Sequence, residues 1–153
     1  MGTPDFASAI LDALFSSPAA RVAAVYTQPD RPCGRGRTCK PSPVKELALK
    51  HGTEVRQPEN FRDDAEVQAL ADLAPDVLAV AAYGLILPQA VLDVPQIAPL
   101  NVHASLLPQY RGAAPIQRAL QNGESVTGVS IMRMEAGLDS GPLLLQRALG
   151  VAP

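Results

Sequence analysis

Apolar residues recur along the chain in two spacings, and these predict alternating strands and helices. Short continuous apolar runs predict buried strands, and apolar residues every three or four positions predict amphipathic helices. Strands are expected at residues 21–27, 54–56, 76–82, 99–103, 127–134 and 143–149, and helices at 4–14, 44–50, 62–73, 89–92 and 115–121. This alternation predicts an α/β fold: a Rossmann-like, mostly parallel sheet with helices on both faces.

The chain opens on a helix signal with almost nothing before it. Thr3 can cap a helix, Pro4 suits the first helical position, and Asp5 favours the positive end of the helix dipole. In an α/β domain such a glycine turn normally follows a strand, whereas only Met1 precedes Gly2. We therefore expect the first strand of the sheet to be missing.

Composition and charge narrow the class of protein. The 153 residues are the size of one domain, 47% are apolar, and the formal net charge of −2 excludes a global attraction to nucleic acid. Without a bilayer-spanning run or a signal peptide, we expect a cytoplasmic protein with no membrane contact, and we expect a monomer. Cys33 and Cys39 have no histidine close by in sequence, so neither a zinc site nor any other metal site is expected.

Residues 28–43 form the one basic stretch of the chain. They contain three glycine or proline clusters, four arginine or lysine residues and a single acid, so we expect a long exposed loop. Two readings stay open here: ordinary solvated surface charge, or contact with a polyanion such as nucleic-acid phosphate. The GRG piece within it lacks the third glycine and the strand–turn–helix setting of a dinucleotide fingerprint.

The candidate chemistry centres on the end of the strand expected at residues 99–103. The period of two places Asn101 and His103 on the same face. In open α/β sheets the site lies beyond the carboxyl ends of the strands, so we expect the loops 28–43, 83–88, 103–112 and 135–141 to meet there. Asp139, in the last of these loops, is thereby expected to lie near Asn101 and His103.

An amide, an imidazole and a carboxylate together suit acyl transfer. An amide and a protonated imidazole stabilise a developing oxyanion, and neither Ser105 nor Ser140 lies in a Gly-x-Ser-x-Gly elbow. The expected reaction is direct attack of a substrate amine on a bound acyl donor. The alternatives are a turn role for Asp139 and a satisfied, half-buried state for His103.

Eight stretches carry a family resemblance: GTPDF (2–6), TQPDRP (27–32), GRG (34–36), PSPVK (41–45), YGLILP (83–88), NVHASLLP (101–108), RGAAPIQ (111–117) and GLDSG (137–141). In these stretches the chain resembles the methionyl-tRNA formyltransferase family over nearly its whole length. The match is to the N-terminal formyltransferase domain, truncated at both ends. The Asn-x-His, Ser-Leu-Leu-Pro and Asp motifs are shared by folate-dependent formyltransferases generally, and the basic loop is specific to the tRNA branch.

The resemblance implies transfer of a formyl group from 10-formyltetrahydrofolate to the α-amine of methionyl initiator tRNA, without a metal. It implies catalytic roles for Asn101, His103 and Asp139. The residues implied in folate binding are Ser105, Leu106, Leu107, Pro108, Tyr83, Gly84, Leu85, Ile86 and Leu138. Those implied in binding the aminoacyl-tRNA are Phe6, beside the methionine side chain, and Arg31, Arg35, Arg37 and Lys40, beside the acceptor stem.

The resemblance also sets the expected domain content. Residues 1–153 correspond to an incomplete catalytic domain, and the C-terminal tRNA-binding β-barrel domain of the family is expected to be absent. Two alternative functions stay open. One is a truncated module that binds folate or tRNA without turnover, and the other is a formyltransferase acting on a sugar nucleotide or on glycinamide ribonucleotide.

Overall fold

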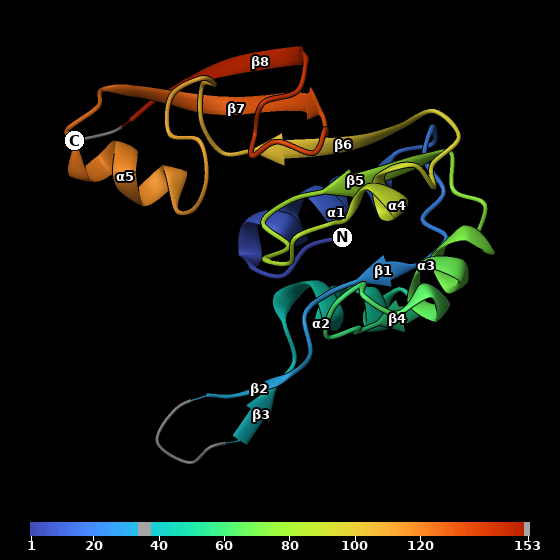
Figure 1. Cartoon of the computed structure of the whole chain (residues 1–153). Helices are drawn as coiled ribbons and strands as arrows, with labels where there is room; N and C mark the ends of the chain where they lie inside the picture. The colour runs from blue at the N-terminus through green and yellow to red at the C-terminus, as the bar shows by residue number, and fades with distance from the viewer. Residues whose placement is uncertain (34–37, 152–153) are drawn as a thin grey trace.

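The computed structural model describes residues 1–33 and 38–151, and its elements follow the predicted order closely (Figure 1). The helices are α1 (Asp5–Ser16), α2 (Pro43–Lys50), α3 (Asp64–Ala71), α4 (Gln89–Leu92) and α5 (Pro115–Gln121). The strands are β1 (Val25–Tyr26), β2 (Arg31–Cys33), β3 (Thr38–Lys40), β4 (Val55–Arg56), β5 (Val77–Val80), β6 (Ala98–His103), β7 (Val126–Arg133) and β8 (Leu143–Gly150). None of the helices in these ranges is long and apolar enough to cross a membrane.

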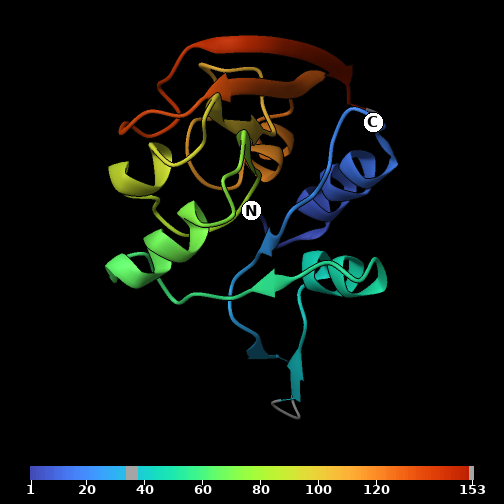
Figure 2. The same cartoon turned by 90° about the vertical axis from the view of Figure 1, so that its right-hand side faces the viewer.

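Helices cover both faces of the strands, which confirms the predicted α/β class (Figure 2). One apolar cluster joins α1 and α2 to β1, through buried residues such as Leu11, Val44 and Val25. A second cluster joins α3 and α4 to β5, through residues such as Leu70 and Val91. Each of these four helices contributes buried apolar residues from one face to its cluster, as an amphipathic pattern requires.

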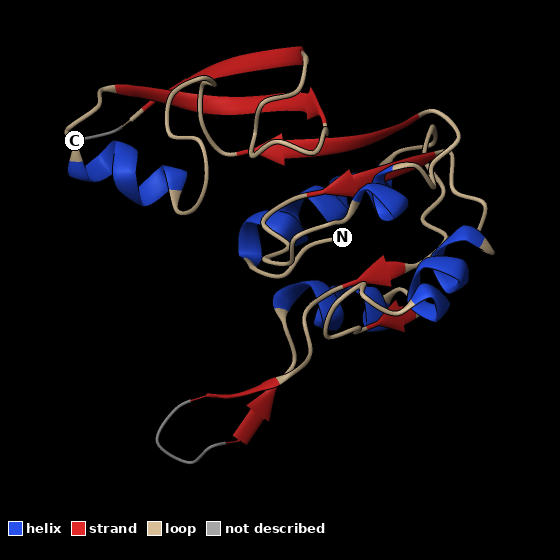
Figure 3. Cartoon of the chain, in the orientation of Figure 1, coloured by secondary structure: helices blue, strands red, loops and turns tan. Residues whose placement is uncertain are grey.

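The strands form one four-stranded sheet in the order β5-β6-β7-β8 and two separate pairs, β1-β4 and β2-β3. The pairs β1–β4 and β5–β6 are parallel, whereas β6–β7 and β7–β8 are antiparallel. The parallel prediction therefore holds only for the N-terminal part. Residues 104–125, including α5, lie beyond the end of β6 instead of crossing back over a sheet face, so β7 returns antiparallel (Figure 3).

Met1 and Gly2 lie between β1 and β5, in the place of a strand. The Gly2 amide donates to the Tyr26 carbonyl at 2.9 Å, and Gly2 forms an isolated parallel bridge with Ala81. The strand predicted at residues 21–27 is shorter in the structure and spans Val25–Tyr26.

The stretch 28–43, predicted to be a long exposed loop, is exposed at Arg31 and Lys40 but is not loop throughout. The stretch contains the antiparallel hairpin β2–β3, which projects away from the rest of the chain (Figure 1). Its register places Arg31 opposite Lys40, so two like charges face each other across the hairpin.

The predicted cap of α1 is also wrong. The Thr3 hydroxyl donates to the Tyr83 carbonyl at 3.0 Å instead, and no side-chain cap bond forms at that helix. Other helix starts do have side-chain caps: Ser42 accepts from the Lys45 amide, and Asp63 accepts from the Ala65 amide.

Candidate functional site

Asn101 and His103 end β6 on the same face. Strand β6 pairs with β5 on one side and β7 on the other, with Asn101 opposite Val80 and Met132, and His103 opposite Ser130. Two neighbours hold the backbone of β6, so the two side chains are fixed relative to each other. Asn101 is half-buried and His103 is buried.

Asp139 reaches this face by a route that the sequence did not predict. Because β7 runs antiparallel to β6, the connection from β7 to β8 begins beside Pro99, where the Met134 amide donates to the Pro99 carbonyl at 2.8 Å. The prediction that this loop leaves the sheet at the carboxyl end of β6 is therefore wrong. The connection turns back along β6 instead (Figure 1), and Gly141 allows it to pass close to β7, since a Cβ there would overlap the Arg133 carbonyl.

The Asp139 carboxylate joins three parts of the chain. Its Oδ1 accepts from Asn101 Nδ2 at 3.0 Å, and its Oδ2 accepts from the Gly112 amide at 2.8 Å. The same Oδ2 lies 3.6 Å from His103 Nδ1, and the Asp139 side chain is only 11% exposed. Asp139 has a φ of 46°, a left-handed conformation that Asp tolerates better than most residues. The structure thus brings the three predicted catalytic residues together.

The second ring nitrogen of His103 contacts the loop after β6. His103 Nε2 lies 2.9 Å from the Tyr110 carbonyl, which can only accept, so Nε2 carries a hydrogen in this arrangement. The Tyr110 hydroxyl donates to Glu124 at 2.6 Å and accepts from Asn122 at 3.0 Å. The hydrogen bond to Glu124 raises the pKa of the Tyr110 phenol. The residues after α5 therefore anchor the carbonyl that orients His103.

This arrangement offers hydrogen-bond donors and a proton acceptor but no activated nucleophile. An amide nitrogen carries two hydrogens, so Asn101 can donate to a ligand oxygen while keeping its bond to Asp139. The Ser105 hydroxyl is used within the loop, where it donates to the Gln109 carbonyl at 2.6 Å. No group of three or more His, Cys, Asp and Glu residues in the described ranges is arranged to hold a metal ion.

The segment Ser105–Pro108 follows the site directly and is held from the side by β7 and β8. The fully buried Ser130 hydroxyl donates to the Ser105 carbonyl at 2.6 Å and accepts from the Leu107 amide at 3.0 Å. Gln146 Nε2 reaches both the Leu107 carbonyl, at 2.8 Å, and the Ser130 hydroxyl, at 2.9 Å. Sequence reasoning missed Ser130 and Gln146. The available signal was a polar residue within each apolar strand, of which Ser130 is buried and Gln146 is exposed.

The segment Tyr83–Ile86 leaves the carboxyl end of β5, next to the carboxyl end of β6. Tyr83 is buried, and its carbonyl accepts from Thr3 and from Gln28. Leu85 is half-buried and Gly84 is exposed, while Ile86 is 95% exposed and Leu138 is 73% exposed. Ile86 and Leu138 each present apolar side-chain surface to solvent.

The described residues expected to bind the aminoacyl-tRNA belong to α1 and to the hairpin β2–β3. Phe6 is half-buried against the apolar cluster of α1, α2 and β1. Arg31 and Lys40 are exposed on the hairpin β2–β3. Arg35 and Arg37 lie outside the described residues.

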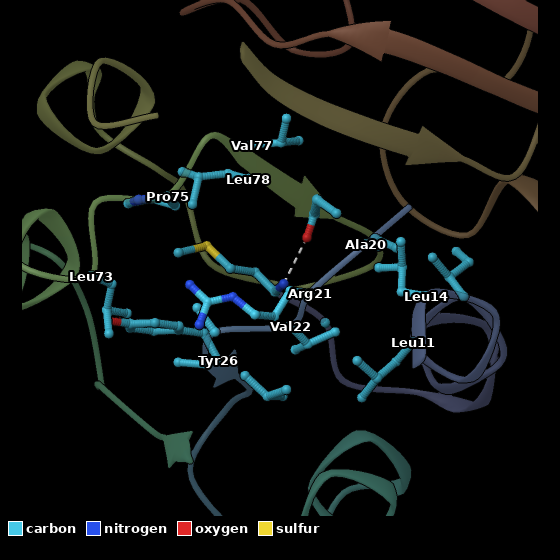
Figure 4. A pocket seen from close by; sticks show the side chains of 18 of the residues that line it. Leu11, Leu14, Ala20, Arg21, Val22, Tyr26, Leu73, Pro75, Val77 and Leu78 are labelled. Atoms are coloured by element: carbon cyan, nitrogen blue, oxygen red, sulfur yellow. Dashed lines mark hydrogen bonds between the residues drawn. The ribbon is translucent and has the colours of Figure 1, made fainter. Parts of the chain in front are cut away.

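A cavity of about 550 Å³ lies elsewhere in the molecule, between β1 and β5 (Figure 4). Leu11 and Leu14 of α1, Val22 and Tyr26 before and in β1, and Leu78 of β5 are among its walls. It contains none of the three residues Asn101, His103 and Asp139.

Comparison with known proteins gives the same picture of the chain. A family model described as formyl transferase matches residues 1–153. Methionyl-tRNA formyltransferase of Nitratidesulfovibrio vulgaris (strain DP4) is 64% identical over 151 residues, which cover 99% of this chain and 46% of that protein. Methionyl-tRNA formyltransferase of Pseudomonas syringae pv. syringae (strain B728a) is 60% identical over 145 residues, covering 95% and 46%. The chain thus spans about half the length of these curated relatives.

Solved structures share the fold at lower identity. Phosphoribosylglycinamide formyltransferase from Bacillus halodurans superimposes with a TM-score of 0.77 at 23% identity, covering 99% of this chain and 78% of that one. Glycinamide ribonucleotide transformylase 1 from Symbiobacterium toebii gives 0.74 at 27% identity, covering 99% and 71%. These similarities support the α/β formyltransferase fold.

Proposed function

This chain belongs to the formyl transferase family, and from that premise we propose that it forms the catalytic part of a methionyl-tRNA formyltransferase. The proposed reaction moves a formyl group from 10-formyltetrahydrofolate to the α-amine of methionyl initiator tRNA. Two relatives of that name, 64% and 60% identical, support this choice of substrates. The observation that carries the catalytic proposal is the Asp139 carboxylate, which lies between Asn101 Nδ2, the Gly112 amide and His103 Nδ1.

The proposed chemistry needs stabilisation of an oxyanion and movement of one proton. The amine nitrogen attacks the formyl carbon, a new C–N bond forms, and the formyl oxygen takes up negative charge. We assign the free amide hydrogen of Asn101 and a protonated His103 as donors to that oxygen. As the tetrahedral intermediate collapses, the bond from the formyl carbon to the folate nitrogen breaks. The proton lost by the amine passes to the leaving nitrogen, with Asp139 as the carrier.

This assignment requires a change at Tyr110. His103 Nε2 already donates to the Tyr110 carbonyl, and His103 is only 7% exposed. For Nε2 to donate to a substrate, the segment around Tyr110 must shift. The contacts between Asp139 and Gly112 restrain the same segment, so we propose that Asp139 also sets the position of this loop.

The folate donor is assigned to the face formed by Ser105–Pro108, Tyr83–Ile86 and Leu138. The exposed Ile86 and Leu138 side chains supply apolar surface, and Ser130 and Gln146 hold the Ser105–Pro108 backbone. We assign Arg31, Arg35, Arg37 and Lys40 to the tRNA phosphates and Phe6 to the methionine side chain. The cytoplasmic location and the monomeric state stay predictions.

Formyl transfer to charged initiator tRNA, measured on matched variants, tests this proposal. We expect Asn101→Ala to lower kcat by about 10²–10³-fold, the range for loss of one oxyanion donor. His103→Ala and Asp139→Asn are expected to lower kcat by about 10²–10⁴-fold, the range for loss of a proton-transfer group. The matched controls are His51→Ala, whose ring stacks on Phe15, and the exposed Asp12→Asn.

Three outcomes would contradict the proposal. Full activity in the His103 variant would remove the catalytic assignment. Faster transfer to glycinamide ribonucleotide or to an amino sugar nucleotide than to methionyl-tRNA would replace the acceptor. Binding of folate or tRNA without transfer, in a folded chain, would instead support a module without turnover.

A further inference from the structure

A group of polar side chains lies where the hairpin β2–β3 leaves the rest of the chain (Figure 1). Among the described strands, β2 and β3 pair only with each other, so no sheet sets the direction in which the hairpin points. The polar side chains come from the segments before β2, after β3 and after β4: Thr27, Gln28, Asp30, Ser42, Lys45 and Gln57. Their contacts with one another are therefore placed to set that direction.

Gln57 bonds to both sides of the hairpin base. Its Oε1 accepts from Lys45 Nζ at 2.8 Å, while its Nε2 donates to the Gln28 carbonyl at 2.9 Å and to Asp30 Oδ1 at 2.8 Å. An ammonium group can only donate, and a carbonyl or a carboxylate can only accept, so these partners fix which end of the Gln57 amide faces which side. A single side chain thus joins the segment that enters the hairpin to the segment that leaves it.

Two direct contacts also close the base of the hairpin. Lys45 Nζ donates to Asp30 Oδ2, and the hydroxyl oxygens of Thr27 and Ser42 lie 2.7 Å apart. Hydrogen bonds from Lys45 and from Gln57 lower the pKa of the Asp30 carboxyl, so it is charged at neutral pH. Asp30, Lys45 and Gln57, which we call the base cluster, each contact the other two. Such a closed set of contacts cannot turn about one bond, as a single pair can.

The base cluster is also connected to the segment that follows β5. Gln28, whose carbonyl accepts from Gln57, uses its own Nε2 to donate to the Tyr83 carbonyl at 3.0 Å. Gly84 leaves room for this contact, because a Cβ at that position would overlap the Gln28 side-chain nitrogen. The hairpin is therefore held relative to Tyr83–Ile86, the segment assigned to the folate donor.

We propose that Gln57 is a positioning residue, which acts through Asp30 and Lys45 to hold the hairpin in one direction relative to Tyr83–Ile86. This inference rests on the proposed function, in which the hairpin contacts tRNA phosphates. Formyl transfer requires the reacting atoms to meet at about 3–3.5 Å, and an error of about 1 Å in placement can cost about 10²-fold in rate. A hairpin held in advance also binds tRNA without the cost of ordering it.

Kinetics of formyl transfer test this role. Methionine is close to glutamine in length but offers only a weak acceptor. We expect Gln57→Met to raise KM for methionyl-tRNA about tenfold and to lower kcat less than about threefold, because the contacts of Asn101, His103 and Asp139 are unchanged. A merely destabilised fold would instead lower kcat at unchanged KM, since fewer molecules would be active.

Matched variants separate the base cluster from a general effect of glutamine loss. Gln57→Glu should raise KM for methionyl-tRNA more than Gln57→Met, because the new carboxylate would face the Asp30 carboxylate. Gln68→Met is the control: Gln68 is exposed on α3 and bonds only to Asp72 among the described residues, so we expect both constants to stay unchanged.

A distance measurement tests the base cluster without folate or tRNA. Spin labels are attached to Lys40→Cys on the hairpin and to Asp64→Cys at the exposed start of α3, with Cys33 and Cys39 replaced by serine. We expect a narrow distance distribution by pulsed electron paramagnetic resonance. Gln57→Met should broaden this distribution, and so should Lys45→Met, which opens the base cluster from its other side. Gln68→Met should not, and cooperative melting of each variant shows that it is folded.

The two measurements have different consequences. An unchanged distance distribution in Gln57→Met and Lys45→Met would overturn the role of the base cluster, whatever the kinetics. A broadened distribution with unchanged KM for methionyl-tRNA would overturn the positioning role, and with it the assignment of the hairpin to tRNA. No transfer by the parent chain would contradict the proposed function, and the distance distribution would still decide whether Gln57 holds the hairpin.

Discussion

Ser130→Ala tests how the Ser105–Pro108 segment is held. The Ser130 hydroxyl is fully buried and makes three hydrogen bonds: to the Ser105 carbonyl, from the Leu107 amide and from Gln146. Removing it leaves the two backbone groups without this partner, while Gln146 keeps its bond to the Leu107 carbonyl. A buried polar group left unpaired costs about 1–3 kcal/mol, so we expect a loss of roughly 2–4 kcal/mol in the free energy of unfolding.

Urea unfolding and thermal melting measure this loss directly. For a chain of this length, about 1 kcal/mol corresponds to roughly 2–4 °C, so Tm should fall by roughly 5–15 °C. The matched control is Ser125→Ala, because Ser125 is exposed next to the start of the same strand, and we expect it to change Tm by less than about 2 °C. A Ser130→Ala variant as stable as the control would refute the reasoning.

The same variant separates structure from the proposed function. A loosened Ser105–Pro108 segment is expected to raise KM for 10-formyltetrahydrofolate more than it lowers kcat, because Asn101, His103 and Asp139 are held by other contacts. A fall in kcat at unchanged KM would show that this segment does not form the folate site.

Three further predictions concern other parts of the chain. The hydrogen bond from Lys45 holds the pKa of the Asp30 carboxyl below its usual value. Because this pair is partly exposed, it contributes less than about 1 kcal/mol to the free energy of unfolding. That contribution is present above about pH 4 and is lost as the pH falls through the lowered pKa of Asp30. Lys45→Met should therefore destabilise at pH 7 and less at pH 2 in urea titrations; equal losses would contradict this. Gly128→Ala should lower Tm by several degrees, because the new alanine methyl would overlap the Leu106 side chain and the backbone of β8. An unchanged Tm would show that Leu106 and β8 can move apart without loss of stability. Tyr83→Phe should leave the free energy of unfolding unchanged or slightly higher, because the buried Tyr83 hydroxyl has no hydrogen-bond partner in the described structure; a loss above about 1 kcal/mol would reveal one.

The local hydrophobic pattern was sufficient to predict most helices and strands and to place Asn101 and His103 on one face of a strand. The helices at Gln89–Leu92 and Pro115–Gln121 begin and end where their apolar spacing and prolines predict. Strand β6 ends at His103, so the period of two correctly placed Asn101 and His103 on one face. These features depend on residues within a few positions of one another.

Contacts between residues far apart in the sequence could not be predicted from the local hydrophobic pattern. The hairpin β2–β3 lies in a stretch whose glycine and proline content suggested only a loop, and the pairing partners of β7 depend on where α5 turns the chain. Ser130 and Gln146 look like ordinary polar residues in apolar strands until the fold places the Leu107 backbone beside them. A single sequence records which residues are polar, and it does not record their partners.

The candidate site shows most clearly what the sequence determined and what the tertiary structure decided. The sequence alone determined the residue types, an amide and an imidazole two positions apart and an aspartate between glycines, and with them the class of reaction that they suit. Only the tertiary structure decided that Asp139 reaches them by folding back along β6 from an antiparallel neighbour. The physical reason lies in the 22 residues, 104–125, that connect β6 to β7. Their path decides whether β7 runs parallel or antiparallel to β6, and their hydrophobic pattern is compatible with either direction.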